Sequence, residues 1–250
     1  MFKQMCFFRK HPDMTMEEFM DYYENQHSTL AKRMGMKPAI PNAVRYVRRG
    51  SLKELSYDDF ESVLDVHLRG GFHVVRAAFP LMCAAKYGRI VLTSSINGLY
   101  GNPGVVNYSM AKAGLIGLSN VAAIEGAVDG VKSNIIIPAA VTRMAEGLDT
   151  SQYPPMDPAL VAPAVAWLAH ESCSITGEQL ISVAGRVARA YAAETEGVYR
   201  PSWSIEDIAE NIGAIRDMSN PWHFPPAPSG HLDHLRRSFK MATEGAAKKD

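Results

Sequence analysis

Three side chains near the middle of the chain have the types and spacing needed for proton transfer: Ser95, Tyr108 and Lys112. A phenol has an unperturbed pKa of about 10, so alone it is a poor acid or base at neutral pH. A lysine ammonium held nearby favours the phenolate and lowers that pKa. A serine hydroxyl can hydrogen-bond the reacting oxygen and hold it beside the phenol. The three residues predict proton transfer at an alcohol oxygen while a cofactor exchanges hydride at carbon.

The elements that must position these side chains can be read around them. Tyr108 and Lys112 are four residues apart at the start of a helix expected over 108–126, so both point to the same side. Ser95 ends the run GRIVLTSS, whose continuously apolar centre is typical of a parallel strand covered on both faces. Because open α/β sheets bind ligands at the carboxyl ends of their strands, we expect Ser95 to face the same crevice.

The remaining periodicity supports an α/β fold. The pattern indicates helices over 56–87 and 157–172, strands over 133–140 and, as the last one, 178–185, and a separate β-α-β unit over 1–49. We therefore predict a partial doubly wound, Rossmann-like parallel sheet with an N-terminal ferredoxin-like β-α-β unit. Strands of that unit, at 2–9 and 43–49, would cover the otherwise unpaired edge of the GRIVLTSS strand.

Gly98, Gly101 and Gly104 lie between this strand and the helix of Tyr108. Their spacing is not G-x-G-x-x-G and the connection is long, so the sequence favours a packed turn over a phosphate-binding loop.

Composition narrows the classes of partner. The 250 residues are 47% hydrophobic, and Lys+Arg and Asp+Glu both total 26, so nothing indicates a nucleic-acid partner. The start MFKQMCFFRKHPDM is too short and polar for a signal peptide or a membrane span. Cys6, Cys83 and Cys173 are scattered, which is typical of reduced thiols. We expect a cytoplasmic protein that binds a small-molecule substrate and neither nucleic acid nor membrane.

The Ser95, Tyr108 and Lys112 spacing resembles that of the short-chain dehydrogenase/reductase family. The segments VHLRGGF, KYGRIVLTSS, LYGNPGVVNYS, PAAVTRM and WLAHESC are most similar to the (3R)-hydroxyacyl-CoA dehydrogenase branch found in peroxisomal multifunctional enzymes. The resemblance covers about 51–218. It implies an NAD- or NADP-dependent oxidoreductase that acts on a secondary alcohol or ketone, with a 3-hydroxyacyl thioester as one substrate class.

The resemblance also assigns roles to residues. It makes Ser95 the substrate-orienting residue and Tyr108 the acid/base, and it places Lys112 on the nicotinamide ribose together with Tyr108. The nicotinamide would be lined by a segment near the third strand: Pro138, Val141 and Thr142. Ala139 replaces the family's usual glycine there. His67 occupies a position where most of the family has asparagine, and we interpret it as a packing residue.

The family's T-G-x-x-x-G-x-G loop and N-N-A-G segment are not found, and residues 1–49 contain a single glycine, Gly35. Without the loop, backbone cannot closely approach a pyrophosphate, so we expect weak NAD or NADP binding. Residues 1–49 instead resemble half of an EthD-like module of the dimeric α/β-barrel superfamily, with MTMEEFMDYYENQH and His27 as the matching positions. The predicted domains are therefore 1–50, 51–218 and a Pro-rich, polar tail over 219–250.

Alternatives remain open at this point. The Ser-Tyr-Lys set could belong to a non-catalytic homologue that depends on a partner, or the N-terminal segment could bind or degrade small aromatic compounds through His27. His231, Asp233 and His234 could ligate a metal, but a polar tail helix is favoured and no metal site is predicted. The resemblance implies a homo-oligomer formed through the Tyr108 helix.

Overall fold

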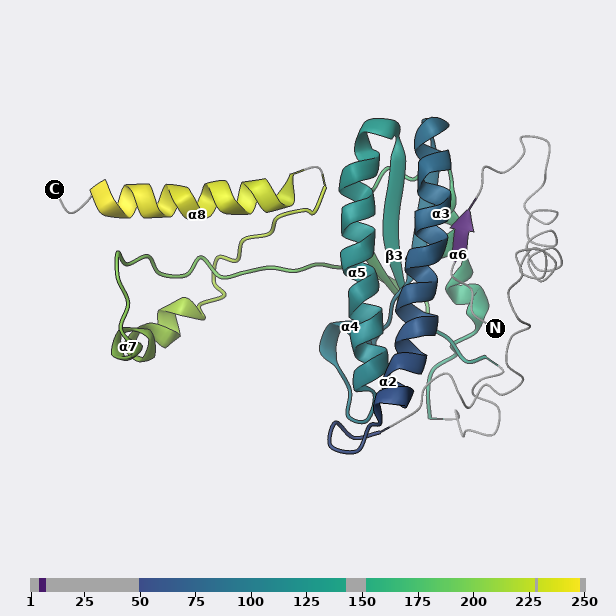
Figure 1. Ribbon diagram of the computed structural model, residues 1–250, viewed down its shortest axis with the longest axis horizontal. Helices are drawn as coiled ribbons and strands as arrows, with labels where there is room; N and C mark the ends of the chain where they lie inside the picture. The colour runs from purple at the N-terminus through teal and green to yellow at the C-terminus, as the bar shows by residue number, and fades with distance from the viewer. Residues whose placement is uncertain (1–4, 8–49, 143–151, 228, 248–250) are drawn as a thin grey trace.

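The computed structural model describes residues 5–7, 50–142, 152–227 and 229–247 (Figure 1). The described part contains one five-stranded sheet in the order β1-β2-β3-β4-β5. Helices cover both faces of this sheet, and two further helices stand away from the layered body.

The three central strands run parallel, and the two outer strands run antiparallel to their neighbours. The central strands are β2 (Gly88–Thr93), β3 (Val131–Ala139) and β4 (Gln179–Val183). The outer strands are β1 (Met5–Phe7) and β5 (Arg186–Ala190). The predicted α/β class with a partial Rossmann-like sheet is confirmed.

Alternating residues of the central strands enter two separate cores. Ile90 and Leu92 of β2 face α3 (Gly70–Ala84) and α5 (Val106–Gly126), whereas Val91 between them faces α6 (Ala162–Ala169). A strand buried on both faces reads as a continuous apolar run, which is why these strands were visible in the sequence. Figure 1 shows α3 and α5 lying side by side over β3.

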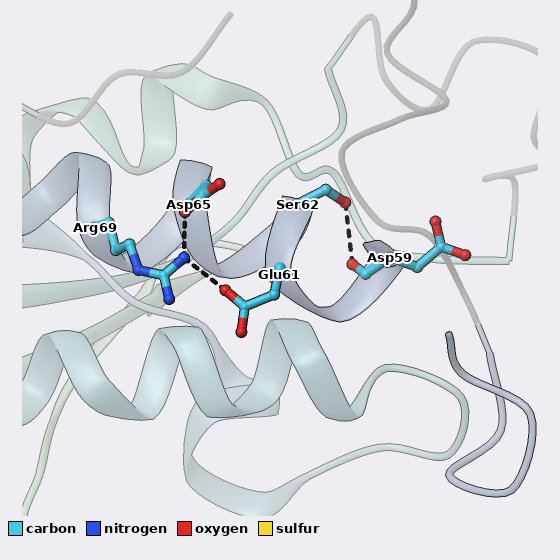
Figure 2. Close-up of polar contacts among 5 residues, drawn as sticks. All are labelled: Asp59, Glu61, Ser62, Asp65 and Arg69. Atoms are coloured by element: carbon cyan, nitrogen blue, oxygen red, sulfur yellow. Dashed lines mark hydrogen bonds and ion pairs between the residues drawn. The ribbon is translucent and has the colours of Figure 1, made fainter. Parts of the chain in front are cut away.

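The helical stretch before β2 differs from the single helix that was expected. It consists of α2 (Tyr57–Leu64), a π-helical turn η2 (Asp65–Arg69) and α3. Arg69 at the end of this turn reaches back to Asp65 and, at 2.6 Å, to the carboxylate of Glu61 (Figure 2). The wide turn changes the direction in which η2 side chains point, and π turns are often found at functional sites.

At one edge of the sheet, β1 pairs antiparallel with β2, with Met5 opposite Val91 and Phe7 opposite Arg89. An N-terminal strand therefore covers this edge, as expected, over residues 5–7. The other predicted elements of the N-terminal unit, and the EthD-like positions that include His27, lie outside the described residues.

At the opposite edge, β4 is not the last strand, because β5 follows it in a tight hairpin. The two connecting residues, Ala184 and Gly185, have positive φ angles of 48° and 82°. Two-residue hairpins require such φ values and are usually recognised by Asn-Gly or Asp-Gly. An Ala-Gly pair gives a weaker signal, so the hairpin was missed.

Beyond β5 the chain forms α7 (Ile205–Ile215) and α8 (Gly230–Ala247). Ser204 and Asp207 form a capping box at the start of α7. An isolated antiparallel bridge between Glu194 and Trp222 joins the segments before and after this helix. Figure 1 shows both helices projecting to one side of the sheet. The predicted tail thus contains a helix of 18 residues.

Arg89 secures the amino end of the sheet. Its buried guanidinium donates from Nη1 to the carbonyl of Gly88 at 2.8 Å and to that of Gly130 at 3.3 Å. Its Nε and Nη2 donate to the carbonyls of His170 and Glu171, both at 3.2 Å, just after α6. One side chain therefore holds β2, the turn before β3 and the end of α6 together.

We predict that Arg89→Met lowers the free energy of unfolding by about 2–4 kcal/mol, because it leaves four carbonyls without their charged donor. Arg89→Lys should lower the free energy of unfolding by less, because its ammonium keeps the charge; it still destabilises, because it cannot reach all four carbonyls. Urea unfolding of the three proteins measures both effects. A wild-type midpoint for Arg89→Met would contradict this assignment.

Candidate functional site

The candidate site lies where β2 ends and α5 begins. Ser94, the first residue after β2, is buried, and its Oγ donates to the carbonyl of Lys112 at 2.8 Å. Its backbone N–H continues the ladder to β3 by donating to the carbonyl of Ile136 at 2.9 Å. These bonds fix the end of the strand against the first turns of α5.

Ser95 is the N-cap of the short helix α4 (Ile96–Tyr100). Its extended backbone (φ −151°, ψ 154°) turns the chain, and its Oγ accepts from the N–H of Asn97 at 3.2 Å. A hydroxyl that accepts one hydrogen bond keeps its own proton as a donor. The Ser95 side chain also hydrogen-bonds the phenol of Tyr108, so the two predicted catalytic residues are brought together.

Gly98 lets α4 pack closely on α5. A Cβ built at this position would lie 2.9 Å from the backbone nitrogen of Ala113 and from the carbonyl carbon of Lys112. The N–H groups of Gly98 and Gly101 are used inside the turn, where they donate to the carbonyls of Ser95 and Asn97. The glycine stretch is therefore a packed turn that carries Ser95, as the sequence indicated.

Tyr108 lies in the first turn of α5 and is partly buried. The ring of His67, from η2, contacts the Tyr108 ring edge to face, with centroids 4.9 Å apart and an interplanar angle of 89°. His67 is 3% exposed, and its packing against the phenol agrees with the packing role expected for it.

Lys112, one turn further along α5, is only 4% exposed. Its Nζ donates to the carbonyl of Thr93 at 2.8 Å and lies 5.6 Å from the centroid of the Tyr108 ring. The structure thus brings Ser95, Tyr108 and Lys112 to the carboxyl end of β2, the edge at which open parallel sheets bind ligands.

The electrostatics differ from the expectation. Burial raises the pKa of the Tyr108 phenol, and the hydrogen bond from Ser95 opposes this only in part. Burial also lowers the pKa of Lys112 to about 8. The expected net lowering of the phenol pKa is therefore wrong for this arrangement, because the desolvation of Tyr108 outweighs what stabilises its charged form.

The predicted nicotinamide-lining residues lie at the neighbouring strand. Pro138 is near the end of β3, opposite Ser182 of β4, and the N–H of Val141 donates to the carbonyl of Met156 at 2.7 Å. Thr142 follows and is exposed. Because β2 and β3 are parallel, their carboxyl ends lie at one edge of the sheet. Contact of these residues with a cofactor stays a prediction.

Sequence reasoning missed Asn107, which directly precedes Tyr108 and is completely buried. Its amide donates to the carbonyl of Asp59 at 3.2 Å, and its Oδ1 accepts from the N–H of Tyr108 at 2.9 Å. The available signal was a short polar side chain inside the first turn of a predominantly apolar helix, where it can bond to the backbone.

Two further observations limit the kinds of site present. In the described ranges, no three side chains of His, Cys, Asp or Glu come close enough together to hold a metal ion. None of the helices in those ranges has the length and apolar character needed to cross a membrane.

A family model described as short chain dehydrogenase matches residues 14–152. The chain belongs to this family. The match begins inside the segment that resembles an EthD-like module; that resemblance stays a prediction.

Three relatives illustrate the similarity. Peroxisomal multifunctional enzyme type 2 of Drosophila melanogaster is 42% identical over 201 residues, which are 78% of this chain and 34% of that protein. A short-chain type dehydrogenase/reductase of Mycobacterium tuberculosis is 37% identical over 193 residues, 76% of this chain and 68% of the relative. An acetoacetyl-CoA reductase of Acinetobacter is 36% identical over 158 residues, 58% and 64% of the two chains.

The solved structure of the full-length Drosophila enzyme superposes with a TM-score of 0.63 at 34% identity, covering 80% of this chain and 41% of that one. By sequence, this chain spans about a third of the length of the Drosophila relative. The two chains share the fold over the superposed residues.

The close packing at Gly98 can be tested against a glycine with free space. We predict that Gly98→Ala lowers the free energy of unfolding by about 1–3 kcal/mol, because its Cβ meets backbone atoms of α5 and overpacks the contact. Gly117 is also in a helix, but nothing lies within 4 Å of the Cβ that alanine would add there. Gly117→Ala should therefore raise the free energy of unfolding by about 0.5–1 kcal/mol through its higher helix propensity. Equal shifts of the urea midpoint in the two variants would refute the close contact.

The buried ammonium of Lys112 should destabilise the fold. Its pKa falls from 10.5 to about 8, and each unit corresponds to 1.36 kcal/mol, so the penalty at neutral pH is roughly 3 kcal/mol. The unfolded chain binds the extra proton between these two pKa values, so stability rises with pH across that window.

We therefore predict that Lys112→Met is more stable than the wild type by about 1–3 kcal/mol at neutral pH. The difference should shrink as pH rises from about 8 to 10.5, where the wild-type lysine becomes neutral in both states. Denaturant titrations at several pH values measure this. A stability difference that does not depend on pH would contradict the assigned cause.

Proposed function

We propose that this chain is an oxidoreductase of the short-chain dehydrogenase type that exchanges hydride between NAD or NADP and a secondary alcohol or ketone. The observation that supports it most is the convergence of Ser95, Tyr108 and Lys112 at the carboxyl end of β2. Family membership and the relatives named as dehydrogenases and reductases support the same class.

Ser95 would orient the substrate oxygen. Its Oγ accepts from the N–H of Asn97, which leaves the hydroxyl proton available, and the side chain lies beside the Tyr108 phenol. A substrate carbonyl placed between the two hydroxyls would accept from both, so its oxygen would be polarised and fixed in position.

Tyr108 would transfer the proton. Because its pKa is raised, the phenol is protonated at neutral pH and can donate to the oxygen on which negative charge develops. A protonated phenol is ready for carbonyl reduction, whereas alcohol oxidation first requires its proton to be removed. We therefore propose that reduction is the faster direction near neutral pH.

Lys112 supplies charge and donors beside this phenol. Its ammonium carries three N–H groups, and one of them holds the carbonyl of Thr93. The positive charge would stabilise the phenolate that forms when Tyr108 gives up its proton.

The donor set fits only one end of a dinucleotide. The Lys112 ammonium and the Tyr108 hydroxyl suit the ribose hydroxyls next to the nicotinamide, and Pro138, Val141 and Thr142 would line the nicotinamide itself. A nicotinamide cofactor, when bound, supplies or accepts the hydride. The sequence does not contain the family's T-G-x-x-x-G-x-G loop for the pyrophosphate, so we propose weak binding.

The proposed substrate class is a 3-oxoacyl or 3-hydroxyacyl thioester. It rests on the similarity to the acetoacetyl-CoA reductase of Acinetobacter and to the multifunctional enzyme of Drosophila, which this chain covers only in part.

A single substitution tests the mechanism. We predict that Tyr108→Phe reduces kcat for NADH- or NADPH-dependent reduction of acetoacetyl-CoA by about 10²- to 10⁴-fold, because the proton donor is lost. Binding of NADH, followed by isothermal titration, should change little, since most of the binding contacts remain. Unchanged turnover in Tyr108→Phe would rule the mechanism out.

A partner-dependent role is the second candidate. Apolar side chains on the outer surfaces of α3 and α5 are exposed, among them Phe72, Leu81 and Val121. We propose that α5, the helix of Tyr108, forms a homo-oligomer through such residues. Light scattering on the purified chain distinguishes a homodimer from a monomer, and co-purification with a larger homologue would favour the partner-dependent role.

We propose a cytoplasmic location on the basis of the scattered cysteines, of which Cys83 and Cys173 are free in the structure. Because relatives are named as peroxisomal enzymes, fractionation of cells that express the tagged full-length protein is the deciding measurement.

A further inference from the structure

Asn107 combines complete burial with two hydrogen bonds that link different parts of the fold. Its Nδ2 donates to the carbonyl of Asp59 in α2, 48 residues earlier in the chain, and its Oδ1 accepts from the N–H of Tyr108. Burying an amide costs free energy unless its donors and its acceptor form hydrogen bonds, so the stability of a buried Asn depends on the groups around it. These surroundings include the peptide of the proposed catalytic tyrosine.

The start of α5 explains why the second bond is needed. The N-cap residue, Val105, has a side chain that cannot accept a hydrogen bond, so the N-cap position makes no side-chain capping bond. The first N–H groups of a helix lack partners within the helix. Asn107 provides an acceptor for one of them, the N–H of Tyr108, from inside the first turn.

The first bond leads to a rigid anchor. The N–H of Asp59 donates to Ser56 Oγ at 3.1 Å. The carbonyl of Asp59 accepts from Ser62 Oγ at 3.0 Å, the bond drawn in Figure 2. The peptide groups on either side of Asp59 are therefore fixed within the first turn of α2. The amide of Asn107 binds to this fixed carbonyl and not to a mobile loop.

The same segment holds the Tyr108 region at two other points. The N–H of Gly50 donates to the carbonyl of Gly104 at 3.1 Å, just before α5, and the ring of His67 packs against the phenol. Arg69 ties the turn that carries His67 back to α2 through Glu61. Residues 50–69 thus contact the backbone before Tyr108, its peptide through Asn107, and its ring.

We infer that Asn107 is a positioning residue for Tyr108, because its amide transmits the position of α2 to the peptide from which the phenol projects. This inference rests on the proposed function, since it assigns Asn107 to the proton-transfer step of Tyr108. A misplacement of about 1 Å can reduce catalysis by about 100-fold, so a backbone tie of this kind affects turnover more than substrate binding.

Three variants separate positioning from stability. Asn107→Ala removes both bonds. Asn107→Asp, when its carboxyl is ionised, keeps the acceptor for the N–H of Tyr108 but has no donor for the carbonyl of Asp59. The control is Ser119→Ala, which removes another fully buried hydrogen bond of α5, the 2.9 Å contact with Ser133, without contact to Tyr108.

Two measurements are made on each full-length protein. The first is the kcat and KM for acetoacetyl-CoA with NADH. The second is the NMR titration of tyrosine labelled at Cζ, in which the Tyr108 resonance is assigned by its loss in Tyr108→Phe.

Both Asn107 variants should lower kcat by about 10- to 100-fold and leave KM within about threefold of wild type. In both, the phenol of Tyr108 should titrate closer to its ordinary range, because a loosened ring is less buried. Ser119→Ala should change neither quantity, even if its urea midpoint falls.

The outcomes are distinguishable. Wild-type kcat and wild-type Tyr108 titration in Asn107→Asp would overturn the tie to α2, and the same result in Asn107→Ala would reduce Asn107 to a stability residue. If Asn107→Ala does not fold, Asn107→Asp decides alone. If the wild type shows no NADH-dependent turnover, the proposed function fails, and the Tyr108 titration still tests the positioning role.

Discussion

The burial of the Lys112 ammonium at the end of β2 is the constraint on which the rest of the site depends. A charged group taken out of water is costly, and the pKa of about 8 expresses that cost. The carbonyl of Thr93 offsets part of it, because the last peptide of β2 faces the helix and not solvent. Ser94 holds that end of the strand by its bond to the carbonyl of Lys112. Strand and helix therefore fix each other through reciprocal bonds between residues 93–94 and 112.

Much of this arrangement follows from the amino-acid sequence. The apolar centres of β2 and β3 predict strands buried on both faces, and the four-residue spacing of Tyr108 and Lys112 predicts that they share one side of α5. The parallel order then predicts that Ser95 joins them. These inferences succeed because each depends on local periodicity and on the general behaviour of parallel sheets.

Other features depend on contacts that the sequence pattern does not encode. The π turn before α3 and the role of Asn107 appear only when α2 and α5 are packed together. The sign of the Tyr108 pKa shift depends on how deeply the phenol is buried, and a motif does not give that depth. The β5 hairpin was missed because Ala184-Gly185 is an uncommon turn pair. The expected N-terminal helix and second strand lie outside the described residues.

The antiparallel direction of β1 and β5 has a consequence for how the molecule can change. A parallel neighbour requires a long crossover with a helix, whereas an antiparallel neighbour can be attached by a short connection. The β5 margin shows this directly, because two residues join β5 to β4, whereas β1 and β2 are far apart in the sequence. A change of chain at the β5 margin would therefore leave β2 and β3, which carry the candidate site, in place.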